Sequence, residues 1–207
     1  MLTNFMAKIL LLFAHPALEK SRVHKKLVQR VKRLKGITYH DLYQVYPDMD
    51  IDVAYEQQLL LQHDLVILQH PFYWYSAPAI IKQWLDLVLE HGWAYGSGGN
   101  ALAGKWMMNA ISCGGSKEVY QREGRNRFTI RELLAPFDQT AHLCQMHYLP
   151  PFVVHGTHKL GETDIDLCAS QYEELLLCLQ DNRITRDKWM PLTYLNDLNP
   201  IPAPLQT

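Results

Sequence analysis

The stretch KILLLFAHPALEKS, Lys8–Ser21, decides the fold. Its first part, Lys8–Ala14, carries an unbroken apolar run, which predicts a central strand covered on both faces. The turn that follows, His15–Ser21, contains no glycine. A dinucleotide-binding Rossmann domain has a G-x-G-x-x-G turn at this point, so that fold is excluded. A receiver domain is excluded as well, because the first strand does not end in an acidic pocket.

The rest of the chain alternates apolar runs with amphipathic stretches. Strands are predicted at Lys8–Ala14, Ile37–Asp41, Asp64–His70, Lys105–Ser112 and near His142–His147. Helices are predicted after Ser21 as far as Gly36, and at Ile51–His63, Ala79–His91, Thr129–Ala135 and Asp164–Leu179. Strands that alternate with helices imply a parallel sheet with right-handed crossovers. We therefore expect an α/β fold, a flavodoxin-like three-layer sandwich whose five-stranded parallel sheet has the order 2-1-3-4-5.

The chain of 207 residues is long enough for one large core, and we predict a single domain over residues 1–180. Prolines interrupt the remaining residues, 181–207, which are expected to form a surface-wrapping or mobile tail. The formal net charge is -1, so the basic excess typical of a nucleic-acid binder is missing. We expect no nucleic-acid partner.

The amino-terminal apolar run is too short to span a membrane and lacks the cleavage site of a signal peptide. Four cysteines show no close pairing, which favours free thiols in a reducing cytoplasm: Cys113, Cys144, Cys168 and Cys178. Two histidine pairs lack the acidic or thiolate companions of a closed metal site: His142 with His147, and His155 with His158. A cytoplasmic protein without a bound metal is expected.

In the order 2-1-3-4-5, ligands bind beyond the carboxyl ends of the central strands. The first turn there is His15–His24, in which Ser21 caps a helix whose free N–H groups suit a phosphate. Lys20, Arg22 and Lys25 strengthen the positive field around it. Taken alone, however, this turn is better explained as an ordinary capped helix with a solvated basic face.

The other two turns are His70–Ser76 and Ser112–Tyr120. Phe72–Tyr75 are four consecutive aromatic residues, which are costly to leave bare in a solvent-facing turn. A flat heteroaromatic ligand or a dimer partner would cover them, and we favour the ligand. Gly114 and Gly115 allow a ligand to approach backbone N–H groups closely and permit positive φ.

Four segments carry a resemblance to a known family: LLFAHP at 11–16, DLYQVYPDMDID at 41–52, HPFYWYSAPAIIKQWLDLVLEHGWAYGSGGNALAGK at 70–105 and LPPF at 149–152. Together they resemble the flavodoxin-like NAD(P)H:quinone oxidoreductases that include DT-diaphorase, and most closely the ancillary subunits of glutathione-gated potassium-efflux systems. The resemblance implies a flavin (FMN, with FAD as the alternative), NAD(P)H as reductant and a quinone-like acceptor. It also implies a homodimer and a potassium-efflux membrane protein as partner, which would bring the protein to the inner face of the membrane.

The resemblance also implies roles for individual residues. It places four residues at the flavin phosphate and ribityl chain: His15, Ser21, Val23 and His24. It places four at the isoalloxazine ring, namely Phe72, Tyr73, Trp74 and Tyr75, and four at its pyrimidine side, namely Ser112, Cys113, Gly114 and Gly115. Tyr120 is the expected catalytic residue, a hydrogen-bond donor to flavin or substrate, and Tyr95 is expected to line the substrate pocket.

This sequence departs from the family pattern at three positions. His24 stands where relatives often carry asparagine, and Cys113 replaces a common threonine. Asn126 stands where DT-diaphorase has the histidine partner of its tyrosine, which weakens a tyrosine–histidine proton relay. Two functions therefore remain open: a quinone-reducing enzyme, and a regulatory subunit of an efflux system with little turnover. One-electron carriage is disfavoured by the near-neutral charge.

Overall fold

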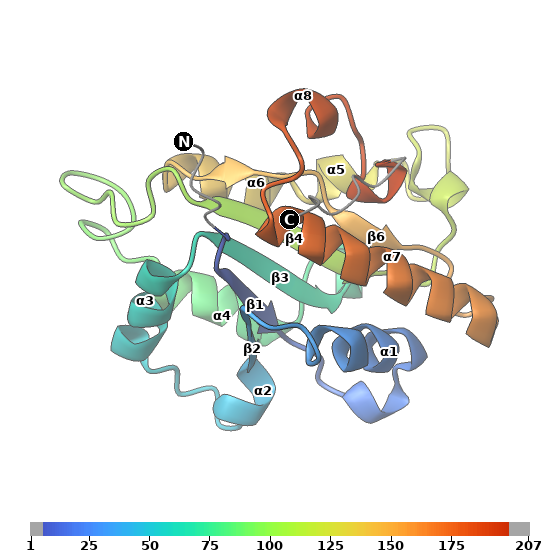
Figure 1. Cartoon of the computed structure of the whole chain (residues 1–207), viewed down its shortest axis with the longest axis horizontal. Helices are drawn as coiled ribbons and strands as arrows, with labels where there is room; N and C mark the ends of the chain where they lie inside the picture. The colour runs from blue at the N-terminus through green and yellow to red at the C-terminus, as the bar shows by residue number, and fades with distance from the viewer. Residues whose placement is uncertain (1–5, 199–207) are drawn as a thin grey trace.

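The computed structural model describes residues 6–198 (Figure 1). Its parallel sheet has the order β2-β1-β3-β4-β5, and a short further strand, β6, also pairs with β4. The predicted flavodoxin-like order is therefore confirmed. The strands are β1 Ile9–Phe13, β2 Ile37–Asp41, β3 Leu65–Pro71, β4 Trp106–Ser112, β5 His147–Tyr148 and β6 Phe152–Val154.

Helices cover both faces of the sheet, which makes three layers (Figure 1). The α-helices are α1 Arg22–Val31, α2 Leu42–Val45, α3 Val53–Gln62, α4 Ala79–Val88, α5 Ile130–Leu133, α6 Ala135–Leu143, α7 Glu162–Gln180 and α8 Arg186–Trp189. Short 3-10 turns are η1 Leu18–Lys20, η2 Tyr73–Tyr75, η3 Lys117–Tyr120 and η4 Leu195–Asp197. Between residues 6 and 198, none of these helices combines the length and the apolar character that crossing a membrane requires.

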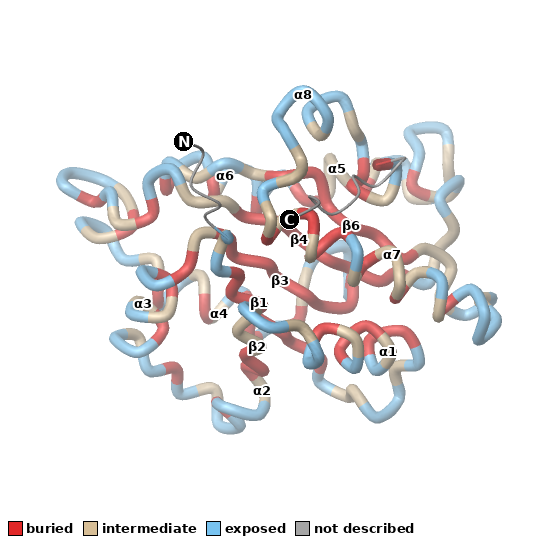
Figure 2. The backbone as a smooth tube through the Cα atoms, in the orientation of Figure 1, coloured by how far each residue is buried: buried red, intermediate tan, exposed pale blue. Residues whose placement is uncertain are grey.

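Strand β1 lies inside the sheet between β2 and β3 and is fully buried, as the opening sequence predicts (Figure 2). Successive side chains point to opposite faces, so Leu10 and Leu12 join the core under α3, α4 and α6. Ile9, Leu11 and Phe13 join the core under α1 and α7. A strand with both faces covered has no room for a polar alternation, which explains its continuous apolar sequence.

The fifth strand is not where the sequence analysis placed it. Instead of a strand near His142–His147, α6 continues to Leu143, and the chain pairs with β4 only afterwards. The pairing comes in two pieces, β5 opposite Trp106 and Met107, and β6 opposite Ala110–Ser112. Pro150 and Pro151 separate them, because proline has no N–H to give to a sheet ladder.

The carboxyl-terminal segment returns to the sheet and covers its edge. The Asn196 side chain accepts a hydrogen bond from the Val153 N–H (2.8 Å) and donates one to the Val153 carbonyl oxygen (3.1 Å). Leu195 and Leu198 are buried in the α1 and α7 core. Residues 195–198 thus lie against strand β6, and a domain boundary at residue 180 stays a prediction. Pro200, Pro202 and Pro204 lie outside the described residues.

Candidate functional site

A cavity of about 330 Å³ opens at the carboxyl edge of the sheet. It lies where β1, β3 and β4 end, between the start of α1 and the loop before α7. Its walls combine cationic, aromatic and small residues: His15, Lys20, Ser21, Arg22, Val23, Pro71, Phe72, Tyr73, Ser112, Cys113, Gly114, Thr157 and His158. The three predicted turns therefore meet in one place.

The first turn presents hydrogen-bond donors to this cavity. Ser21 caps α1, and its hydroxyl oxygen accepts a bond from the His24 backbone N–H (3.1 Å). His15 Nδ1 accepts a bond from the Ala17 N–H (3.1 Å), so a neutral His15 ring carries its proton on Nε2. Burial lowers the pKa of His15, and Glu19 and Asp41 partly oppose this shift. The ring is thus a neutral donor beside a helix N-terminus, an arrangement suited to an anion.

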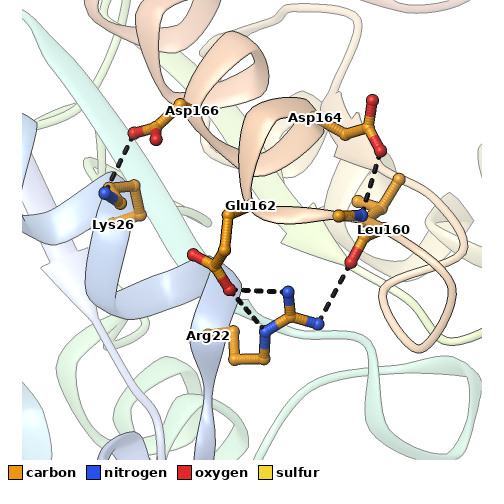
Figure 3. A network of polar contacts seen from close by, with 7 residues as sticks. Arg22, Lys26, Leu160, Glu162, Asp164 and Asp166 are labelled. Atoms are coloured by element: carbon orange, nitrogen blue, oxygen red, sulfur yellow. Dashed lines mark hydrogen bonds and ion pairs between the residues drawn. The ribbon is translucent and has the colours of Figure 1, made fainter.

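The start of α1 is tied to the start of α7 by charged side chains (Figure 3). Arg22 donates from Nε and Nη2 to Glu162 Oε1 (3.0 and 2.6 Å) and from Nη1 to the Leu160 carbonyl oxygen (3.1 Å). Lys26 pairs with Asp166 at 3.0 Å. Exposed pairs of this kind add only about 0–1 kcal/mol each to stability. Their effect is positional, because they fix two walls of the cavity relative to each other.

The second turn holds aromatic rings in a strained backbone. Trp74 and Tyr75 have φ angles of 50° and 62°, in the left-handed region. Such conformations cost bulky residues roughly 1–3 kcal/mol each and concentrate at ligand-binding turns. Phe72 packs into the core, whereas Trp74 is 92% exposed. The turn therefore keeps an aromatic surface free next to the cavity.

The third turn needs its glycines for space. A Cβ on Gly114 would lie 2.7 Å from His158 Nε2, and one on Gly115 would lie 2.6 Å from Val119 Cγ2. Neither glycine adopts the positive φ that the sequence analysis allowed for them. Thr157 N–H donates to the Cys113 carbonyl oxygen (3.1 Å), which holds the loop before α7 against this turn.

Cys113 and Tyr120 face each other behind the third turn. Burial raises the pKa of Cys113 to about 12, so the thiol stays protonated at neutral pH. Burial also raises the pKa of Tyr120 to about 12, and the neighbouring Cys113 adds to this shift. His155 Nδ1 lies 3.4 Å from the Cys113 sulfur. This geometry supports a packing role for Cys113 rather than a redox role.

The predicted residues occupy three different places. Most of them line the cavity: His15, Ser21, Val23, Phe72, Tyr73, Ser112, Cys113 and Gly114. The neighbouring Trp74, Tyr75, Gly115 and Tyr120 belong to the same turns without lining it, and the His24 side chain is fully buried beneath it. Tyr95 lines a separate cavity of about 550 Å³ beside α4 and α6.

Two cavity residues were missed, Thr157 and His158. They follow β6, which lies later in the chain than the strand predicted near His142–His147, so this turn was not among the predicted ones. The signal was present in the apolar run FVV at 152–154, which the motif His155–His158 follows. Among residues 6–198, no group of three or more histidine, cysteine or acidic side chains is arranged to hold a metal ion.

Comparison with known proteins gives one family match and several similar proteins. The model of a family described as having a flavodoxin-like fold matches residues 7–176. The glutathione-regulated potassium-efflux system ancillary protein KefG of Pectobacterium carotovorum is 45% identical over 169 residues, which cover 82% of this chain and 92% of KefG.

Solved structures are similar to this chain as well. General stress protein 14 of Treponema denticola, in complex with FMN, has 41% sequence identity and a TM-score of 0.80, and the match covers 84% of this chain and 99% of that one. An NADPH-quinone reductase of P. pentosaceus has 34% sequence identity and a TM-score of 0.74, and the match covers 82% of this chain and 97% of that one. The resemblance inferred from the sequence is thereby confirmed, and the chain belongs to the family of proteins with the flavodoxin-like fold.

Proposed function

We propose that this protein is a flavin-dependent NAD(P)H:quinone oxidoreductase that binds FMN in the cavity between His15 and Gly114. One observation carries the proposal: the donor-rich start of α1, the free aromatic surface of η2 and the glycine turn after β4 converge on one cavity. The similar protein solved in complex with FMN supports this cofactor, and the one named NADPH-quinone reductase supports this reaction.

The residues present fit such a cofactor. His15 Nε2 and the N–H groups at the start of α1 would hold the phosphate, with Lys20 adding positive charge. Tyr73 and Trp74 would cover the ring. Gly114 lines the cavity without a side chain, so the ring can approach the backbone N–H groups of the turn. The similarity to the structure solved in complex with FMN favours FMN over FAD.

A bound flavin supplies hydride transfer between NAD(P)H and the acceptor. The chain's own residues position it and exclude water, and the N–H groups of the glycine turn stabilise negative charge at the ring. Tyr120 is the proposed catalytic donor: with a pKa of about 12 its hydroxyl keeps its proton at neutral pH. Tyr120 is buried and does not line the cavity, so the third turn must move to bring this hydroxyl to a substrate.

A second function is supported by the identity to KefG: docking on a potassium-efflux membrane protein, at the cytoplasmic face of the membrane. The same flavin site serves either role. We also propose a homodimer, for which the apolar cavity of Tyr95, Leu85 and Leu143 beside α4 and α6 offers a contact surface.

Steady-state turnover tests the enzymatic proposal. The FMN-loaded protein should oxidise NADH or NADPH in the presence of 1,4-benzoquinone at about 1 s⁻¹ or faster, the lower end of typical enzyme rates. The measurement is the fall in nicotinamide absorbance with and without the quinone, with free FMN as control. If the protein binds FMN but neither nicotinamide reduces it, the oxidoreductase proposal is wrong and the regulatory role takes its place.

A further inference from the structure

A line of buried polar side chains runs beneath the cavity and joins four elements of the fold. The Tyr172 hydroxyl of α7 donates to Gln69 Oε1 of β3 (3.1 Å). Gln69 Nε2 lies 3.4 Å from His24 Nδ1 in α1, and His24 Nε2 lies 2.9 Å from the Ser112 hydroxyl oxygen at the end of β4. Tyr172, Gln69 and His24 are fully buried, and Ser112 is 8% exposed where it meets the cavity.

The direction of each hydrogen bond in this line follows from the donors available. Because Gln69 Oε1 accepts from Tyr172, the amide NH₂ of Gln69 must face His24. His24 Nδ1 is then the acceptor, and a neutral ring carries its proton on Nε2. Burial keeps the ring neutral by lowering its pKa well below the usual value, and His15 and His70 add to this effect. His24 Nε2–H therefore donates to Ser112.

This arrangement determines which hydrogen bonds the Ser112 hydroxyl can form. Its oxygen accepts from His24, so its own proton must be donated elsewhere. Among residues 6–198, the Ser112 side chain makes no other hydrogen bond, and it lines the cavity. A hydroxyl held in this way presents its proton to whatever acceptor occupies the cavity.

We propose that His24 is a positioning residue that makes Ser112 a fixed hydrogen-bond donor to the flavin, an inference that rests on the proposed function. A donor aimed at the ring stabilises the negative charge that reduction brings. The line from Tyr172 to Ser112 therefore tunes the relative affinity of the site for reduced and oxidised flavin. The same hydrogen bonds assign a function to His24.

The reduction potential of the bound FMN tests this inference, because a purely structural role would not move it selectively. In Ser112→Ala, the ratio of affinities for reduced and oxidised FMN should fall about tenfold, which is a drop of ~30 mV in a two-electron midpoint potential. His24→Leu should give a similar drop, and His24→Gln, which keeps an N–H donor, should restore most of it. Tyr172→Phe removes only a hydroxyl on α7 and should lower the potential by a smaller amount.

A double-mutant cycle shows whether His24 acts through Ser112. In the Ser112→Ala background, His24→Leu should change the potential no further. Full additivity of the two changes overturns the inference, and so does an unchanged potential in both His24→Leu and Tyr172→Phe. If His24→Leu does not fold, Tyr172→Phe and Ser112→Ala decide the question. A wild-type protein that binds no FMN would overturn the proposed function itself, and this inference with it, whereas bound FMN of unchanged potential overturns the inference alone.

Discussion

Gly114→Val should abolish FMN binding while leaving the fold intact. A Cβ at this position lies 2.7 Å from His158 Nε2 and 2.8 Å from its Cδ2, much closer than real side chains allow. His158 lines the cavity, so its ring must shift to make room for the valine, and the space available to the flavin changes. We expect the affinity for FMN to fall by at least 100-fold, or about 3 kcal/mol. Titration of the flavin-free protein with FMN, followed by flavin fluorescence, measures this change.

Gly161→Ala is the matched control. Gly161 precedes α7, a Cβ there meets nothing closer than Asp164 Oδ2 at 3.4 Å, and the residue does not adopt positive φ. This variant should bind FMN like the wild type, and both variants should give the wild-type circular dichroism spectrum. Wild-type affinity in Gly114→Val would refute the placement of the third turn against the flavin.

The second large effect is a loss of stability in acid. His70 is fully buried, and its hydrogen bonds require a neutral ring: Nδ1–H donates to the Pro71 carbonyl oxygen (3.0 Å), and Nε2 accepts from the Asn109 amide (3.0 Å). Tyr148 fixes that amide by donating to Asn109 Oδ1 (2.6 Å). Burial is the main cause that lowers the pKa of His70 from 6.5 to about 4.

The sign of the effect follows from proton linkage. The unfolded state takes up the proton near pH 6.5 and the folded state only near pH 4, so stability is complete above pH 6.5 and falls as the pH drops toward 4. Between pH 7 and 4.5, His70 alone accounts for about 2 kcal/mol. Urea unfolding at the two pH values measures the loss. In His70→Gln this difference should shrink by about that amount, and an unchanged difference would contradict the assignment.

The parts of the fold that the sequence predicted are those in which local pattern and burial agree. Strands β1 and β3 are apolar because both faces are covered, so their positions follow from composition alone. The strand pairing at the far edge has no such run: β5 contains only His147 and Tyr148, and two prolines separate it from β6. Its position depends on contacts with β4, which no local pattern records.

In the candidate site, too, some features could be predicted from the sequence and others could not. Glycine and aromatic turns after buried strands are visible in a sequence, which is why the second and third turns were found. The burial of the His24 side chain was not predicted, because the resemblance assigned that position to the flavin phosphate. Its spacing from Leu27, Val28 and Val31 places it on the buried stripe of α1, a signal that was available. The hydrogen bonds from Tyr172 to Ser112 join residues distant in sequence and required the structure.

The cavity at the carboxyl edge of the sheet is proposed to bind a flavin. The most direct test is the visible absorption spectrum of the purified protein, followed by denaturation and identification of the released cofactor. We predict a flavin absorption band, one flavin per chain, and release of FMN. A colourless protein that takes up neither FMN nor FAD on reconstitution would contradict the claim.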